Sequence, residues 1–480
     1  MPRHFLHRRY LGMLVALLLC LLFYALNPFR VSVAANTVLA VAVLMVVLWV
    51  SESLPMAVVA LFPLVLFPVL GIAPIDATAS SYANPVIFLF MGGFMLGLAI
   101  EKWNLHRRIA LNIVKLTGTS GDRIVLGFII ATGLISMWLS NTATTMMMFP
   151  IALSVVAVIK ENHAQQKGTD NFALSVMLAI ALASNFGGIA TIIGTPPNVA
   201  YAAFIYKKYG TEVPFLDWML VCTPLAILLL FSLYLVMVKW LYPNGMKEDE
   251  STHRLIHSEV AALGKMSPAE KRVLTVFLLT ATLWITRSFI NSLGIIRLDD
   301  NMIALIGGIA LFVVPSGKDP KEGLLVWDDT KRLAWGILLL FGGGIALASA
   351  LEKAGLIESL GQWFAQFAFN QLMLIFLVTL ISLFISELMS NVAQVIVFAP
   401  VVTSLAEAAG MHPLHLGIPM TLAASCASML PMGTPPNAIA FSSGYIKLNQ
   451  MTRVGFVMNI VSVILITLFC WILLPLVLAH

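Results

Sequence analysis

Two short polar motifs each occur twice in a chain that is otherwise strongly apolar. The first reads Ser-Asn-Thr at 140–142 and Ser-Asn-Val at 390–392, and the second reads Gly-Thr-Pro-Pro-Asn at 194–198 and again at 433–437. Their hydroxyl and carboxamide oxygens are hard, neutral ligands that suit a cation such as Na⁺ better than a transition metal. Backbone N–H groups at the start of a helix bind anions. The motifs therefore indicate non-covalent binding of a cation and an anion close together.

The elements that must position these motifs are interrupted helices. The Ser-Asn motifs lie at the centres of the apolar blocks 124–160 and 371–409, which are too long for one spanning helix and are predicted to be re-entrant hairpins. The Gly-Thr-Pro-Pro-Asn motifs lie at the centres of 172–206 and 414–446. Two successive prolines remove two backbone donors and break a helix, so both blocks are predicted to be broken helices. Such irregular backbone is tolerated in a bilayer only where protein or water surrounds it.

The same landmarks recur in the same order, which indicates an internal duplication. Residues 90–105 match residues 341–356, the Ser-Asn motifs are 250 positions apart, and the Gly-Thr-Pro-Pro-Asn motifs are 239 positions apart. Each half contains five spans and one hairpin, so the second copy is predicted to face the opposite way. Inverted repeats of this kind place a site at the bilayer midplane, where the halves meet. The predicted organisation is a first transmembrane helix in 1–33, a first inverted repeat in 34–241, a cytoplasmic linker in 242–271 and a second inverted repeat in 272–480.

The composition supports a membrane protein. Hydrophobic residues make up 60% of the 480 residues and charged residues 11%, against roughly 25% charged residues in soluble domains. This excludes a soluble enzyme and a disordered chain, and we expect an all-α polytopic protein with about 11 transmembrane helices plus the two hairpins. One of these helices is expected near 54–71. The first apolar run is followed by Asn27-Pro28 rather than a cleavage site, so we expect it to be retained.

The basic residues set the predicted orientation. With the N-terminus in the cytoplasm, the inner loops hold 22 of the 28 basic residues, including Lys167, Lys318 and Lys321, as the positive-inside rule requires. The net charge of +5 is thus explained by orientation, and no nucleic-acid partner is expected. The four cysteines lie in apolar segments and are interpreted as packing residues.

Glu387 is an acidic residue inside an apolar block, three positions before Ser390. Its counterpart in the first half, 250 positions earlier, is Met137. Acidic residues within a membrane are functional candidates by default, but a carboxylate beside an anion site would repel the substrate. Two interpretations stay open, a structural partner near the cation ligands and a direct functional role.

Together, the two pairs of motifs resemble those of a known family. Paired Ser-Asn-Thr/Val and Gly-Thr-Pro-Pro-Asn motifs in inverted halves resemble the divalent anion:sodium symporter family, which includes bacterial Na⁺/dicarboxylate symporters, over nearly the whole chain. The resemblance implies a homodimer in the bacterial inner membrane. It also implies an elevator mechanism, in which a transport domain carries substrate and sodium past a scaffold domain at the dimer interface.

The resemblance also implies roles for individual residues. The first sodium site would use Ser136, Ser140, Asn141 and the Gly194 carbonyl, and the second would use Ser386, Asn391, Gly433 and the Met389 carbonyl. The substrate would contact Ser140, Asn141, Thr142, Ser390, Asn391 and Val392, with Thr195, Pro196, Thr434 and Pro435 nearby. Val392 departs from a symmetric Ser-Asn-Thr pair and removes one possible hydrogen bond, worth about 1 kcal/mol.

We therefore expect Na⁺-coupled uptake of a small dianion, most simply a C4-dicarboxylate such as succinate. No Arg or Lys lies at either Ser-Asn motif, so helix-end amides, hydroxyls and bound cations would have to stabilise the anion. The alternatives are a sulfate or tricarboxylate symporter and a sodium-independent dicarboxylate exchanger. An intramembrane enzyme is disfavoured because no hydrolase or metalloprotease motif is found, and an ion channel is a further alternative.

Overall fold

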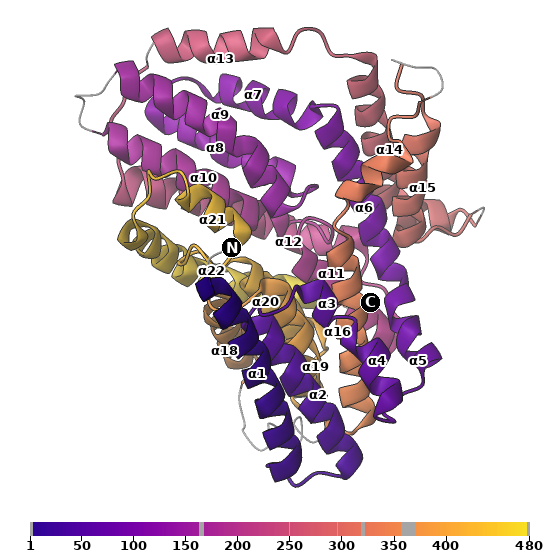
Figure 1. Ribbon diagram of the computed structural model, residues 1–480. Helices are drawn as coiled ribbons and strands as arrows, with labels where there is room; N and C mark the ends of the chain where they lie inside the picture. Colours follow the sequence, from indigo (N-terminus) through magenta and orange to yellow (C-terminus); the bar gives the residue numbers. More distant parts are fainter. Residues whose placement is uncertain are drawn as a thin grey trace.

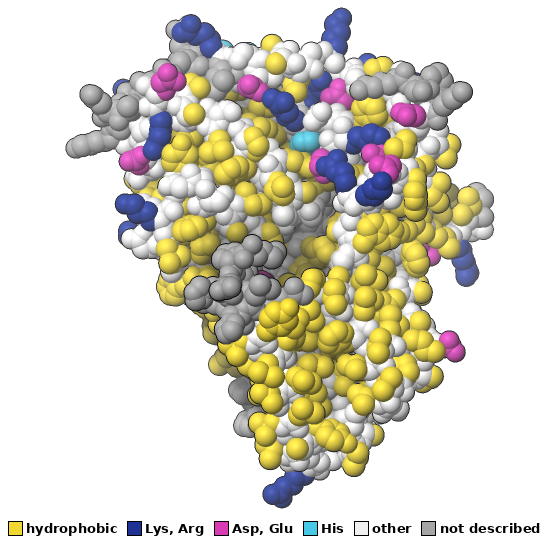
Figure 2. All heavy atoms as spheres, viewed as in Figure 1, with side chains coloured by type: hydrophobic (Ala, Val, Ile, Leu, Met, Phe, Trp, Pro, Cys, Tyr) yellow, Lys and Arg dark blue, Asp and Glu magenta, His cyan; other side chains and the backbone are white. Residues whose placement is uncertain are grey.

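The computed structural model describes residues 3–162, 168–248, 250–294, 296–317, 322–356 and 370–477. The regular elements of these ranges are helices (Figure 1). Within the ranges, nine helices are long and apolar enough to cross a membrane, and five shorter apolar helices accompany them. Figure 2 shows hydrophobic side chains covering the lower part of one face and charged side chains gathered at its upper end. Lys167, Lys318 and Lys321 lie outside the described residues.

The N-terminal part consists of apolar helices, and a segment that was expected to be one span is interrupted. These elements are α1 (Arg3–Leu26), α2 (Val33–Val50), α3 (Met56–Val59), α4 (Phe62–Val69), α5 (Ile75–Ala79), η1 (Ser80–Ala83) and α6 (Pro85–Lys102). The sequence predicted one span near 54–71, whereas the structure has α3 and α4 with a break between them. Pro63 explains the break, because it has no N–H to donate to the carbonyl of Val59.

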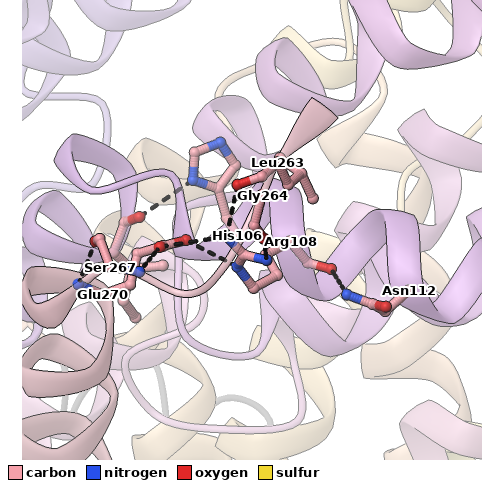
Figure 3. A network of polar contacts seen from close by, with 8 residues as sticks. His106, Arg108, Asn112, Leu263, Gly264, Ser267 and Glu270 are labelled. Carbon is pink, nitrogen blue, oxygen red and sulfur yellow. Dashed lines mark hydrogen bonds and ion pairs between the residues drawn. The ribbon is translucent and has the colours of Figure 1, made fainter. Parts of the chain in front are cut away.

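α7 (Leu105–Thr117) is an amphipathic helix that follows a left-handed turn at Asn104, where φ is 56°. Arg108 ties it to the connection between α13 (Glu250–Ala262) and α14 (Pro268–Ser292) (Figure 3). The guanidinium forms a two-point ion pair with Glu270, at 2.9 and 3.3 Å, and donates to the carbonyls of Leu263 and Gly264 at 3.0 Å each. The predicted linker 242–271 thus contains a helix and is fastened to the first half.

Each of the two blocks centred on a Ser-Asn motif consists of two helices. The first comprises α8 (Gly121–Ser136) and α9 (Asn141–Asn162), and the second comprises α18 (Gln371–Ser386) and α19 (Asn391–Ala408). The four-residue breaks at 137–140 and 387–390 end at the serines of the two Ser-Asn motifs. α8 and α9 lie side by side (Figure 1), and each pair places the start of its second helix at the Asn of the motif.

The blocks centred on Gly-Thr-Pro-Pro-Asn are also interrupted. α10 (Thr169–Gly188) is followed by α11 (Pro196–Tyr209), and α20 (Leu414–Ser425) is followed by α21 (Pro435–Phe441). In both cases the second helix begins at the first proline, where the missing N–H would have no partner in the helix in any case. The loops before the prolines, 189–195 and 426–434, therefore contain backbone groups outside any helix.

The two halves pack crosswise. α21 of the second half contacts α9 and α10, while α11 of the first half contacts α19 and α20. The remaining elements are α12 (Phe215–Tyr234), η2 (Leu235–Leu241), α15 (Asp300–Val313), η3 (Trp327–Arg332), α16 (Trp335–Lys353) and α22 (Leu448–Val477). α12 packs on α10, and α22 packs on α18 and α20. This arrangement brings both pairs of interruptions to the middle of the molecule.

Candidate ion and substrate site

Backbone carbonyls converge on the loop before the first Pro-Pro pair. A Cβ at Gly194 would lie 2.4 Å from the Gly188 carbonyl oxygen and 3.0 Å from those of Ser136 and Met137. These oxygens come from the last turn of α10 and from the end of α8, where helix carbonyls have no partner within the helix. Only glycine leaves room among them. Carbonyls at half-helix ends are the ligands that membrane transporters use for Na⁺, so this group of atoms, which we call the first cradle, fits that ion.

The two Ser-Asn tips have the same internal geometry. Ser136 Oγ lies 2.9 Å from Asn141 Oδ1 and 2.8 Å from the Ser184 carbonyl oxygen. In the second half, Ser386 Oγ lies 2.8 Å from Asn391 Oδ1 and 2.6 Å from the Ala424 carbonyl oxygen. The serine that ends one helix thus holds the asparagine that begins the next. The duplication seen in the sequence therefore extends to individual hydrogen bonds.

The asparagines of the two Gly-Thr-Pro-Pro-Asn motifs hold their own loops. Asn198 Nδ2 donates to the Thr191 carbonyl at 2.9 Å and lies 3.5 Å from the Gly188 carbonyl. Asn437 Nδ2 donates to the Leu430 carbonyl at 3.2 Å and to the Ala427 carbonyl at 3.4 Å. Both side chains are fully buried. The motif asparagine therefore fixes the loop instead of pointing an amide group into open space.

The second cradle, around Gly433, differs from the first. The atoms nearest to a Cβ built at Gly433 are Glu387 Oε2 at 3.2 Å and the Leu430 carbonyl oxygen at 3.3 Å, and the Met389 carbonyl is not among the three nearest. Glu387 Oε1 accepts hydrogen bonds from the amides of Ser428 and Met429, at 2.8 Å each. The carboxylate therefore lies against the loop that leads to α21.

Glu387 replaces a contact that the first half makes in another way. In the first half, the Thr191 hydroxyl donates to the Met137 carbonyl at 2.5 Å, which joins the loop to the tip. At the equivalent positions of the second half, the Leu430 amide donates to Glu387 Oε2 at 3.1 Å. Asn459 Nδ2 of α22 adds a bond to Oε1 at 2.7 Å. The described contacts of this carboxylate are thus structural, which favours the first of its two interpretations.

The donors for an anion come from the hairpin helices. α9 begins at Asn141 and α19 at Asn391, and the first N–H groups of a helix have no acceptor within it. α11 and α21 instead begin with two prolines and lack these N–H groups. The starts of α9 and α19 thus offer backbone amides, whereas carbonyl oxygens gather around Gly194 from the ends of α8 and α10.

The outer residues of the predicted site lie at its edge. Ser140, Thr142, Pro196, Ser390, Asn391 and Val392 are half-buried and Pro435 is exposed, while Asn141, Thr195, Gly194, Ser386 and Thr434 are buried. The Val392 side chain packs against the apolar core. The site thus has buried oxygens below partly accessible tips.

The sequence did not predict that a basic side chain, Arg332, lies near the first tip. A recess of about 90 Å³ is lined by Trp138 and Ser140 of the tip, by Glu101 at the end of α6 and by Arg332 of η3. Arg332 forms an ion pair with Glu101. No local signal could reveal this, because Arg332 is distant in sequence from the tip and comes close only through the packing of α6 and η3.

Sequence reasoning also missed Asn185, which lies in the last turn of α10. Its Oδ1 is 3.4 Å from Asn141 Nδ2, and its Nδ2 is 3.1 Å from Thr434 Oγ1 and 3.4 Å from Asn437 Oδ1. A polar residue in the otherwise apolar end of α10, shortly before the break, was the signal available. This side chain brings the two motif sets of the two halves into one network.

This fold, with paired interrupted helices that meet at the centre of an all-helical membrane protein, defines the class of secondary transporters. The chain belongs to the family described as the sodium:sulfate symporter transmembrane region, which matches residues 7–477.

Relatives agree with this assignment, and two solved structures have a similar fold. The chain is 38% identical over 472 residues to the sodium-dependent dicarboxylate transporter SdcS of Staphylococcus saprophyticus, covering 97% of this chain and 90% of the relative. It is 39% identical over 471 residues to SdcS of Staphylococcus aureus (strain bovine RF122), covering 96% and 90%. The fold is similar to the YdaH transporter of Alcanivorax borkumensis, with a TM-score of 0.56 at 14% identity over 82% of this chain and 86% of that one. MtrF of Neisseria gonorrhoeae gives a TM-score of 0.55 at 14% identity over 82% and 83%.

Proposed function

We propose that this protein couples the entry of Na⁺ to the uptake of a small divalent anion, in the first place a C4-dicarboxylate such as succinate. The observation that carries the proposal is the first cradle, where three carbonyl oxygens surround Gly194 beside the amide-bearing start of α9. The names of the Staphylococcus relatives, sodium-dependent dicarboxylate transporters, support the same substrate pair.

Sodium binds first in this mechanism. Cations in the cradles place positive charge beside the tips, and the dianion then binds to the amides and hydroxyls of Ser140, Asn141, Ser390 and Asn391. A ligand shifts a conformational equilibrium only by its differential affinity for the two states. Sodium and the dianion therefore drive the movement of the loaded site through their combined differential affinity for the outward-facing and inward-facing states. Two Na⁺ per dianion would be electrically neutral, and each further inward charge would gain about 2.3 kcal/mol per 100 mV.

The proposal includes the setting expected from the sequence. The protein is a multi-pass membrane protein, and we place it in the bacterial inner membrane, with a cytoplasmic N-terminus, as a homodimer that works by an elevator movement. The crosswise packing of α21 on α9 and α10 and of α11 on α19 and α20 supports a transport domain that is built from both halves. A sulfate symporter is the second candidate, because the family description names sodium and sulfate.

Uptake of radiolabelled succinate by proteoliposomes tests the proposal. We expect uptake driven by an inward Na⁺ gradient, none when choline replaces Na⁺, and competition by unlabelled sulfate only if sulfate is also a substrate. Asn141→Ala and Asn391→Ala should abolish uptake, whereas Asn112→Ala, which removes an exposed asparagine from α7, should not. Equal uptake in choline would instead identify a sodium-independent exchanger, and unitary currents would identify a channel.

A further inference from the structure

We propose that Asn185 is the positioning residue through which sodium in the first cradle organises the second half of the site. The inference rests on the proposed sodium-coupled transport and deepens it. Asn185 belongs to the first half, at the end of α10, yet both donor contacts of its carboxamide are with the second half, Thr434 Oγ1 at 3.1 Å and Asn437 Oδ1 at 3.4 Å. Its oxygen faces Asn141 Nδ2 at 3.4 Å.

These four hydrogen-bonded residues form a chain of contacts that is buried away from water. Asn185 and Asn437 have no exposed surface, Thr434 is 4% exposed and Asn141 is 8% exposed. Hydrogen bonds in such surroundings are electrostatically stronger than in water, and successive bonds polarise one another. A change at one end of the chain is therefore transmitted to the other end with little screening.

The chemistry of the amides sets the direction in which polarisation passes along these hydrogen bonds. Asn141 Oδ1 lies beside the first cradle, 2.1 Å from a Cβ built at Gly188. Sodium at the cradle would draw on this oxygen, and the withdrawal of electron density makes Asn141 Nδ2 a better donor to Asn185 Oδ1. The same polarisation passes through the Asn185 amide to Thr434 Oγ1. Thr434 accepts from Asn185 and from the Asn437 amide, the latter at 3.4 Å. Its hydroxyl hydrogen can then be donated to a carboxylate of the substrate.

The second half does not offer the same bridge in return. The equivalent residue in α20 is Ser425, because Ser136 donates to the carbonyl just before Asn185, that of Ser184, and Ser386 donates to the carbonyl just before Ser425, that of Ala424. The Ser425 hydroxyl lies 3.4 Å from the Thr421 carbonyl of its own helix. Among the described residues, Asn198 Oδ1, the equivalent of the Asn437 oxygen that Asn185 contacts, is buried without a hydrogen-bond partner. The coupling is therefore one-sided, and the structure assigns the first cradle as the site whose occupation prepares the second half.

Asn185→Ser and Asn185→Ala test the inference, with Ser425→Ala as the matched control at the equivalent position. The measurement is equilibrium binding of radiolabelled succinate to the purified full-length protein across a series of Na⁺ concentrations in detergent. Because coupling between sites typically changes affinity by about 5–150-fold, we expect both Asn185 variants to weaken succinate binding at least about 5-fold at half-saturating Na⁺. We also expect their Na⁺ Hill coefficient to fall towards 1, whereas Ser425→Ala should retain the wild-type values.

The possible outcomes separate the inference from the proposed function. Wild-type Na⁺-linked succinate binding with an unchanged Hill coefficient in Asn185→Ser would overturn the inference and leave the proposed function standing. Absence of Na⁺-linked binding of any dianion to the wild type would overturn both. If Asn185→Ala fails to fold, Asn185→Ser decides alone, since it installs the residue that the other half carries. A purely structural role would lower thermal stability without changing the Hill coefficient.

Discussion

Replacing Glu387 by glutamine distinguishes an anchor from a cation ligand. Glutamine keeps one carboxamide oxygen, which can retain the three donors that now meet Oε1, from Ser428, Met429 and Asn459. Its NH₂ group would then face the Leu430 amide, which now donates to Oε2 at 3.1 Å. The substitution therefore removes one hydrogen bond and sets two donors against each other, without changing the size of the side chain.

The magnitude follows from this count. The loss of charge weakens the three retained bonds but also removes the desolvation cost of a buried carboxylate, and these two effects have opposite signs. The remaining cost is one buried amide without an acceptor, about 1–3 kcal/mol. We expect a loss of about 2 kcal/mol, or about 4–8 °C in Tm for a cooperative unit of 150–250 residues. Glu387→Met, which installs the first half's residue, leaves four donors unpaired and should cost about 4 kcal/mol or more.

Thermal unfolding of the detergent-purified protein in choline chloride and in NaCl is the assay. Thr191→Val is the matched control, because it removes the equivalent tie of the first half. The Thr191 hydroxyl donates to the Met137 carbonyl and accepts from the Gly194 amide, and each of these neutral hydrogen bonds is worth about 1 kcal/mol. As an anchor, Glu387 stabilises the sodium-free protein, so Glu387→Gln must lower Tm in choline, as Thr191→Val does.

The opposite result would refute the anchoring role. A carboxylate that serves chiefly as a cation ligand is a buried unpaired charge when sodium is absent. Its neutralisation would then raise Tm in choline, and the stabilisation by added Na⁺, which follows the ratio of ion concentration to Kd, would disappear. The sign of the Tm change in choline is thus sufficient to choose between the two roles.

Three further substitutions test other parts of the site. Gly194→Ala should abolish the Na⁺ dependence of succinate binding, because its Cβ would lie 2.4 Å from a carbonyl oxygen of the first cradle, whereas Gly433→Ala, with its nearest atom at 3.2 Å, should weaken it less; Na⁺ titration measures both. Val392→Thr should change the order of inhibition by di- and tricarboxylates and leave the Na⁺ titration unchanged, and an identical inhibition profile would contradict the placement of this residue. Arg332→Gln should raise the Kd for succinate more than Lys331→Gln does, since only Arg332 lines the recess.

The sequence predicted the interruptions because their signals are local. A Pro-Pro pair removes two donors wherever it occurs, and the structure begins α11 at Pro196 and α21 at Pro435. The hairpin breaks likewise fall directly before Asn141 and Asn391. The span expected at 54–71 is two helices because Pro63 removes a backbone donor within the apolar run. Local chemistry thus fixes where backbone groups lose their partners.

Local chemistry does not fix which atoms compensate for that loss. Three amides of loop 426–434 donate to Glu387 of the hairpin, and Thr434, which precedes α21, accepts from Asn185 of the other half. Arg332 reaches the first tip only through its packing beside α6. Each of these contacts joins segments that are distant in sequence, and several donors compete for each acceptor. The choice among them depends on the packing of whole helices, which periodicity and motif spacing do not specify.

The internal duplication narrows this gap, because differences between the halves can be read in pairs. Met137 with Thr191 in the first half corresponds to Glu387 with Leu430 in the second, at the offsets of 250 and 239 residues. The polar side chain has moved from the loop to the tip. In both halves the loop donates and the tip accepts, but the first half uses a side-chain donor and a backbone acceptor, and the second half uses a backbone donor and a side-chain acceptor. A polar residue gained at one position and lost at another in the second copy therefore marks two positions in contact. Asn185 and Ser425, paired through the bonds of Ser136 and Ser386, show a second difference. Asn185 contacts the other half, whereas the Ser425 hydroxyl contacts its own helix.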